Sequence, residues 1–305
     1  MSMQKDVHSD LSPLPSGGLI RLQARATGLT SWLAPTWAAL CGVIASGRFS
    51  WGGEDWLKLA LLILLVEGGW GTLWSALGAT DWATPLRRWR QSPPEDEGDG
   101  ASFAVLPYTL PGAPGARLRR FLGRLQAWWR DELWPTCGSA LQALLVALPV
   151  TALLGALLGP ELLLLSVAAL ALSQLGLLWD AGRGVVPPGW DALIAVAWPW
   201  LAGHAAFGPV ALPSAGLAIL FALSWGAAWS TKSNGGRILA ASGQLLAVVL
   251  LVALRRPMAA GALFLLLVPQ LALLPWTRTD HPTAWYVRYT RPWLMAGMAV
   301  AAFAL

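Results

Sequence analysis

The sequence predicts an all-α, polytopic integral membrane protein. Apolar residues make up 56% of its 305 positions and charged residues only 12%, and the mean hydropathy is +0.55. The apolar residues also gather in blocks of roughly 18–22, the length that a helix rising 1.5 Å per residue needs to cross a hydrocarbon core of about 30 Å. A soluble domain of this size does not need so much apolar content.

The chain divides into a polar N-terminal segment, residues 1–28, and a single transmembrane domain, residues 29–305. The polar segment lacks an apolar core followed by a cleavage site, so it is not predicted to be a signal peptide. Nine apolar blocks are candidate spans, in order 29–46, 56–77, 137–158, 161–179, 190–207, 210–229, 237–254, 258–276 and 290–305.

The distribution of positive charge predicts the orientation of these spans. With a cytoplasmic N-terminus, 17 of the 21 Lys and Arg residues fall on the inner side, as the positive-inside rule requires, and the C-terminus lies outside. The net charge of +5 is then a topological feature, and no soluble basic domain remains to bind nucleic acid. Arg greatly outnumbers Lys, and Ala, Gly and Leu are abundant, which favours a bacterial cytoplasmic membrane.

The longest connection, residues 81–134, has three parts. A basic aromatic edge, residues 87–90, precedes an acidic run rich in Pro and Gly, residues 93–100, which we expect to be mobile. Residues 117–130 then place Arg side chains toward one side and Leu, Phe and Trp toward the other. This pattern predicts a basic amphipathic helix on the inner leaflet, or else an ordinary juxtamembrane helix without a specific partner.

A stripe of side chains marks the end of the second span. Glu67, Trp70, Trp74, Leu77 and Asp81 stand at i, i+3, i+7, i+10 and i+14, the spacing of one helix face. A charged carboxylate in the hydrocarbon costs several kcal/mol, so Glu67 is expected to be protonated, paired or beside a wet cavity. It either binds the polar head of a ligand or pairs with a Ser or Thr hydroxyl on a neighbouring helix.

Other candidate residues lie in later spans and loops. Trp225 and Trp229 either complete an aromatic wall around a ligand cavity or pack against lipid and protein. His204 makes either a structural hydrogen bond or a ligand contact. Four polar residues in the inner loops either bind an anionic head group or serve only as positive-inside topology signals. This set is Arg183, Lys232, Asn234 and Arg237.

Two segments follow the second and sixth predicted spans into inner loops. Residues 73–81 read Leu-Trp-Ser-Ala-Leu-Gly-Ala-Thr-Asp, and residues 227–243 read Ala-Ala-Trp-Ser-Thr-Lys-Ser-Asn-Gly-Gly-Arg-Ile-Leu-Ala-Ala-Ser-Gly. Together with nine spans and an inner N-terminus, this layout resembles the UbiA superfamily of intramembrane prenyltransferases. The resemblance covers most of the chain, from about Leu19 onward.

The resemblance implies a helical bundle in which two Asp-rich motifs hold Mg²⁺ and an isoprenyl diphosphate, while an aromatic acceptor is alkylated in a cavity open to lipid. At the positions of the first motif, only Asp81 keeps a carboxylate, and Leu73, Trp74 and Leu77 replace the others. In the second, Gly235, Leu239 and Gly243 match the tail of the motif, whereas Ala227 and Thr231 replace both aspartates.

Metal-dependent ionisation of a diphosphate needs several oxygen ligands around Mg²⁺, which Asp81 alone cannot supply. No metal site or cofactor is therefore expected, and Mg²⁺ enters only if prenyl transfer persists. The resemblance implies a protein that binds an isoprenoid, quinone or pigment-type lipid in the bilayer, or that serves as a subunit or assembly factor beside a membrane-protein partner. The alternatives are a divergent prenyltransferase with Asp81 as a remnant catalytic residue, and an unrelated transporter or scaffold.

Overall fold

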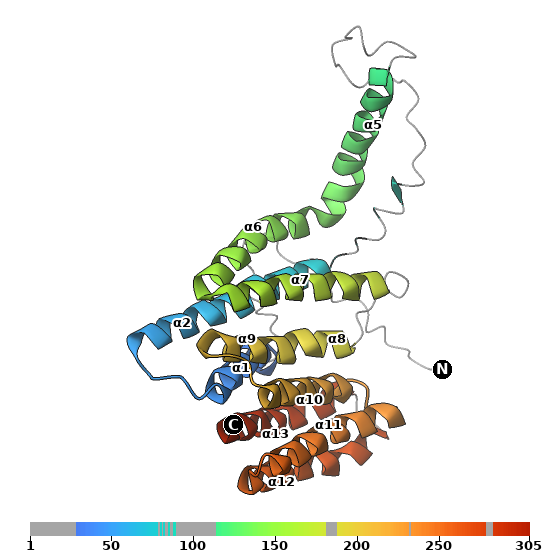
Figure 1. Cartoon of the computed structure of the whole chain (residues 1–305). Helices are drawn as coiled ribbons and strands as arrows, with labels where there is room; N and C mark the ends of the chain where they lie inside the picture. Colours follow the sequence, from blue (N-terminus) through green and yellow to red (C-terminus); the bar gives the residue numbers. More distant parts are fainter. Residues whose placement is uncertain are drawn as a thin grey trace, which may run out of the picture.

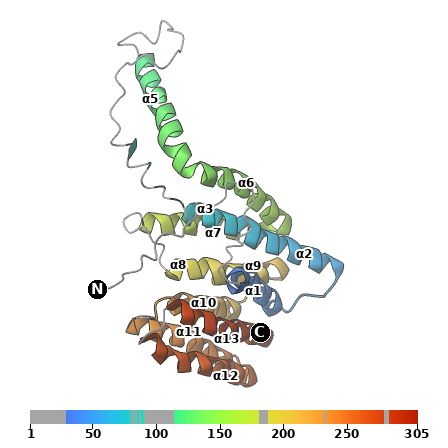
Figure 2. The same ribbon diagram turned by 180° about the vertical axis from the view of Figure 1, so that it is seen from behind.

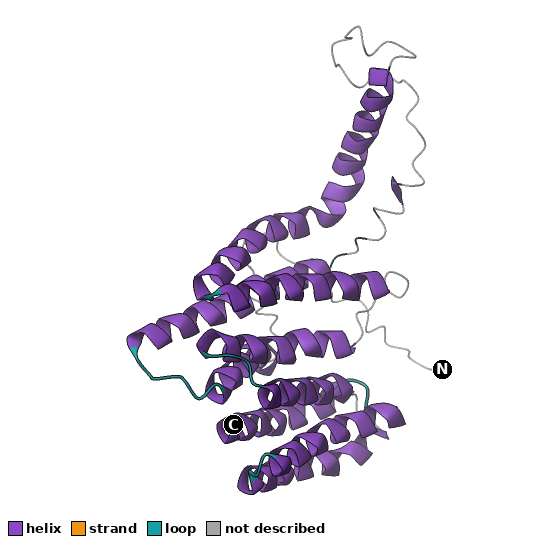
Figure 3. Cartoon of the chain, viewed as in Figure 1, coloured by secondary structure: helices purple, strands orange, loops and turns teal. Residues whose placement is uncertain are grey.

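The computed structural model describes residues 29–78, 80, 82, 85, 88–89, 114–180, 188–231, 233–278 and 283–305. Within these ranges the chain is almost entirely helical and contains no strand, which confirms the all-α prediction (Figure 3). Asp81, Arg183, Lys232 and the acidic run 93–100 lie outside the described residues.

Several helical elements follow one another without a break. The elements are α1 (Leu29–Ala45); α2 (Gly53–Ile63), η1 (Leu64–Trp70) and α3 (Gly71–Gly78); α5 (Pro114–Trp128), η3 (Trp129–Leu133) and α6 (Trp134–Leu158); α7 (Pro160–Asp180); α8 (Pro188–Ala192), η4 (Leu193–Ala197) and α9 (Trp198–Phe207); α10 (Leu212–Ala228); α11 (Asn234–Ala253); α12 (Pro257–Leu273) and η5 (Leu274–Arg278); and α13 (Thr283–Ala304). Each predicted span lies largely within one of these runs.

Four of the described helical runs are long and apolar enough to cross a membrane: Gly53–Leu77, Phe121–Leu158, Asn234–Ala253 and Pro257–Thr277. Shorter apolar helices are Ala34–Ala45, Pro160–Leu175 and Leu212–Ala228. Large apolar side chains point outward on these helices; Leu145 is 77% exposed and Leu265 70%. Contiguous apolar surface of this kind is suited to lipid rather than to water.

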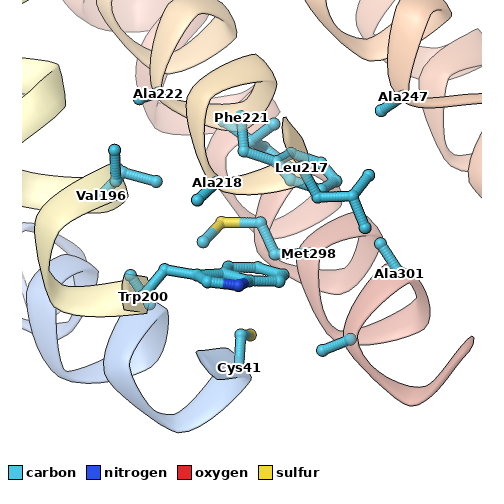
Figure 4. Packing of buried hydrophobic residues seen from close by; sticks show 14 of the residues in the cluster. Cys41, Val196, Trp200, Leu217, Ala218, Phe221, Ala222, Ala247, Met298 and Ala301 are labelled. Atoms are coloured by element: carbon cyan, nitrogen blue, oxygen red, sulfur yellow. The ribbon is translucent and has the colours of Figure 1, made fainter. Parts of the chain in front are cut away.

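The helices form stacked layers (Figures 1 and 2). One layer contains α2, α3, α6 and α7, the next contains α1, α8 and α9, and α10 to α13 lie on its far side. Two apolar clusters hold the layers together. The first surrounds Trp200, Phe221 and Met298 (Figure 4), and the second surrounds Leu62 and Leu162. Helix α1 contributes residues to both clusters and therefore joins the layers.

Helices α1 and α9 approach until their backbones touch. A Cβ atom added to Gly42 would lie 1.9 Å from the carbonyl oxygen of Trp200, and one added to Gly203 would lie 2.0 Å from that of Ala39. Ala38 and Ala39 on α1 are fully buried beside this contact. Small residues allow this approach, which gains dispersion contacts where lipid supplies no hydrophobic drive between helices.

Helix α5 leaves the stack crosswise to α7 (Figures 1 and 2), and residues 114–133 are helical, as predicted for residues 117–130. The guanidinium of Arg124 lies 4.6 Å from the ring centre of Trp89 and donates a hydrogen bond to the carbonyl oxygen of Trp89. Trp128 Nε1 donates to the carbonyl oxygen of Pro85 at 2.8 Å, and Arg88 pairs with Glu132 at 2.7 Å. Arg88 and Trp89 of the basic aromatic edge thus contact the α5–η3 run.

A leucine at either interface glycine should destabilise the protein. Gly42→Leu and Gly203→Leu force α1 and α9 apart, and we expect each to cost about 3 kcal/mol or more, measured as a loss of thermal stability in detergent. Gly261→Leu on α12 is the control, because a Cβ there meets nothing within 4 Å. Equal stability of all three variants would contradict the close packing of α1 against α9.

Candidate functional site

Glu67 is buried, and its carboxylate is bound by α1. Oε1 accepts hydrogen bonds from the hydroxyl of Thr36 at 2.6 Å and from the backbone N–H of Thr36 at 3.1 Å. The side chain is 6% exposed and projects from the π-helical turn η1, a distortion that often occurs at functional sites. Glu67 was expected either to bind a ligand or to pair with a hydroxyl on a neighbouring helix. The structure shows the second arrangement, with Thr36 as the partner.

The tryptophans of the stripe contact different helices. Trp70 Nε1 donates to Ser166 Oγ on α7 at 3.1 Å, and Trp74 Nε1 donates to Asp191 Oδ1 on α8 at 3.1 Å. Leu77 is buried, with 6% of its surface exposed. This face of the η1–α3 run is therefore held by α1, α7 and α8 in succession along its length.

A second group of residues lies where α10 ends beside α13. The guanidinium carbon of Arg291 is 4.8 Å from the ring centre of Trp225, and Arg291 is only 9% exposed. Its Nε atom is buried and has no hydrogen-bond partner. None of the ion pairs among the described residues includes Arg291. The site therefore holds a buried positive charge stacked on an aromatic face.

The turn from α10 to α11 contains the other predicted residues of the inner loops. Trp229 ends α10 and is 42% exposed, so it lines the surface rather than the interior. Arg237 donates to the amide oxygen of Asn234 in the first turn of α11. Ser233 caps that helix by accepting from the N–H of Gly236 at 3.0 Å. Asn234 and Arg237 thus lie together at one helix start.

His204 does not lie with these residues. Its Nε2 is 3.0 Å from the carbonyl oxygen of Pro209, and its Nδ1 is 3.0 Å from Ser214 Oγ. Trp200 Nε1 donates to the same hydroxyl at 2.9 Å. Donors and acceptors match if Nε2 carries the proton and Ser214 donates to Nδ1, so both ring nitrogens are occupied. Asp191 and His204 are thirteen residues apart in one helical run, about 20 Å at 1.5 Å per residue.

The positions that match the two Asp-rich motifs do not fit magnesium where they are described. Trp74, Leu77 and Ala227 bring no oxygen ligand, and the Thr231 hydroxyl lies 3.3 Å from the carbonyl oxygen of Ala228. Among the described residues, no three His, Cys, Asp or Glu side chains are grouped so that they could hold a metal ion. Mg²⁺ prefers several hard oxygen ligands, which these side chains do not provide.

Sequence reasoning missed Arg291 as a site residue. Arg291 was assigned to the inner-side charges because the last span was predicted to begin at residue 290. Helix α13 instead begins at Thr283, so Arg291 lies two turns inside the helix. The available signal was a basic residue flanked by Tyr286, Thr290 and Leu294, which are all buried.

Comparison of the chain with protein-family models, with curated proteins and with solved structures found no match in any of the three.

The bond between Glu67 and Thr36 makes a stability prediction. Glu67→Gln keeps an oxygen that accepts both hydrogen bonds and should change the free energy of unfolding by less than about 1 kcal/mol, whereas Glu67→Leu leaves two donors unpaired and should cost about 1–3 kcal/mol. Thermal unfolding in detergent measures both. If Thr36→Ala does not reduce the cost of Glu67→Leu, the two side chains are not coupled.

The hydrogen bonds that link Trp200, Ser214 and His204 make a second stability prediction. Ser214→Ala removes the acceptor of Trp200 and the donor to His204, and we expect a loss of about 1–3 kcal/mol in the free energy of unfolding. The control is Ser242→Ala, because the Ser242 hydroxyl donates only to its own helix, at 3.2 Å to Leu239. Equal stability of the two variants would argue against the shared network.

Proposed function

We propose that this chain is a nine-span, UbiA-like protein of the bacterial cytoplasmic membrane, with its N-terminus in the cytoplasm and its C-terminus outside. It binds an isoprenoid-type lipid with an anionic head group between its helices and does not carry out conventional Mg²⁺-dependent prenyl transfer. The placement of all nine predicted spans in helical runs supports the topology. The described side chains at the motif positions offer few oxygen ligands for Mg²⁺, which supports lipid binding rather than metal-dependent chemistry.

The observation that carries this proposal is Arg291. A guanidinium that leaves water for a helix bundle loses several kcal/mol of solvation, and intramembrane charges are typically paired or functional. The face of Trp225 returns only about 2 kcal/mol of that loss. An anionic ligand group would supply the missing counter-charge, and its oxygens would accept the hydrogen bond that Nε lacks.

Glu67 is not this counter-charge, because α1 separates it from α13. Thr36 on α1 binds Glu67, while the next residue, Trp37, donates from Nε1 to the carbonyl oxygen of Met295 on α13 at 2.9 Å. Arg291 is one turn before Met295. The acid and the base therefore lie at similar depths beside different faces of α1, and the acid is already hydrogen-bonded.

An apolar helix face continues from Arg291 along α13. Met295 and Ala299 follow at i+4 and i+8, so they share one face of α13 with Arg291, and both are partly buried against the first apolar cluster. A lipid whose head group binds Arg291 would place its chain along this face. A long, flexible apolar chain, such as an isoprenoid chain, suits that face.

Lipid retention tests the proposal. We expect the full chain, purified in mild detergent, to carry an anionic lipid that mass spectrometry detects, and Arg291→Gln to reduce its occupancy about tenfold or more. Arg288→Gln is the matched control, because Arg288 is exposed and lies one turn earlier on α13. A purified chain without lipid, or equal loss in both variants, would overturn the proposal.

Two further measurements separate lipid binding from a structural role of Arg291 and from catalysis. In lipid-free protein, Arg291→Met should preserve or raise thermal stability, because it removes an uncompensated buried charge. A prenyl-transfer assay with Mg²⁺ should show no turnover; turnover that Asp81→Asn abolishes would replace this proposal with the enzymatic alternative.

A further inference from the structure

A pocket of about 330 Å³ opens at the other end of the bundle. It is formed where α1 and α9 end and where α10 and α12 begin, and its lining includes Arg48, His204, Pro209 and Arg256. Trp225, which stacks on Arg291, is thirteen residues along α10 from Leu212, or about 20 Å at 1.5 Å per residue. The pocket is therefore separate from the Arg291 site.

Two arginines bring positive charge to this pocket. Neither Arg48 nor Arg256 takes part in an ion pair among the described residues. Arg48 lies flat against Gly208: a Cβ added there would be 3.0 Å from its Cδ and 3.2 Å from its Nε. The absence of a side chain at position 208 thus gives Arg48 its place along the pocket wall.

None of the side chains that line the pocket is acidic, and two acids at the start of α2 have partners of their own. Glu54 pairs with Lys58 at 3.1 Å, and Asp55 Oδ2 accepts from the hydroxyl and the backbone N–H of Ser50, each at 2.6 Å. The side chains that line the pocket, which extends to Leu305, therefore carry an excess of positive charge from Arg48 and Arg256.

The backbone adds further donors. Helices α10 and α12 begin at the pocket with Ala211 and Arg256 as their N-cap residues, and no side chain caps either helix. Pro213 in α10 and Pro257 in α12 carry no N–H, but the other N–H groups of each first turn have no acceptor within the helix, and the helix dipole favours a negative charge at this end. Two helix starts and two arginines therefore border one cavity.

The hydrogen bonds of His204 fix the pocket wall rather than supply another ligand. Its Nε2 is hydrogen-bonded to the carbonyl oxygen of Pro209, and its Nδ1 is hydrogen-bonded to Ser214. These bonds fix the 208–211 connection against α9 and α10. Apolar side chains stand beside the opening: Leu212 is 88% exposed, Met258 86% and Val210 42%. A positively charged pocket with an apolar rim matches a phospholipid head group and the start of its acyl chains.

We propose that this pocket binds a phosphate group through Arg48, Arg256 and the starts of α10 and α12, and that a phospholipid of the leaflet at this end of the bundle supplies that group. Arginine forms bidentate hydrogen bonds with phosphate oxygens, and helix N-termini provide further donors to the same anion.

The test measures binding of phosphatidylglycerol to the delipidated full chain in detergent by native mass spectrometry. Arg48→Gln and Arg256→Gln should each weaken binding about tenfold, and Arg48→Lys should weaken it less because it keeps the charge. Arg255→Gln is the matched control: Arg255 is as exposed as Arg48 and Arg256, but it does not line the pocket. Arg291→Gln should also leave this binding unchanged, so the two proposed sites can fail independently.

A parallel measurement with inorganic phosphate shows whether a lipid or a free anion supplies the phosphate group. If phosphatidylglycerol binding depends on Arg48 and Arg256, a lipid supplies it. If only inorganic phosphate raises the thermal stability of the protein, and the same two substitutions abolish that rise, a free anion supplies it and the site is upheld while the lipid is not. If neither ligand depends on the two arginines, or if Arg255→Gln has an equal effect, the proposal is overturned.

Discussion

The close contact between α1 and α9 is the constraint on which the rest of the structure depends. Gly42 and Gly203 let the two backbones touch, so α1 can lie between the two apolar clusters and supply residues to both. From that position it presents Thr36 to Glu67 on one side and Trp37 to α13 on the other. A wider separation would move both polar contacts, because they arise from consecutive residues of one rigid helix.

Most interior polar groups of the described chain are satisfied within the protein. Gln244 and Gln270 exchange amide hydrogen bonds at 2.8 and 2.9 Å, Trp70 bonds Ser166, and His204 bonds on both sides of its ring. Buried polar groups are normally paired in this way because an unpaired one costs about 1–3 kcal/mol. The hydroxyls of Thr72 and Thr151 also lack a partner, but Arg291 differs from them because it carries a charge that has only an aromatic face opposite it.

The sequence was sufficient for features that depend on local pattern. Apolar block length predicted where the helices lie, and amphipathic spacing predicted the helix over residues 117–130. It could not identify partners distant in the chain: nothing near Glu67 indicates Thr36, and nothing near Trp74 indicates Asp191. The assumed start of the last span hid Arg291, because helix boundaries are the least reliable part of such reasoning.

The location of Arg48 and Arg256 at the other end of the bundle supports the proposal that they bind an anion. In the proposed nine-span orientation, only Arg48, Lys58, Arg255 and Arg256 fall on the outer side, where the positive-inside rule disfavours basic residues. Lys58 is paired with Glu54. Of the remaining three, two line the same cavity, although Arg48 and Arg256 are more than two hundred residues apart. The proposed topology does not by itself explain why two such charges line one cavity, whereas the proposed anionic ligand does.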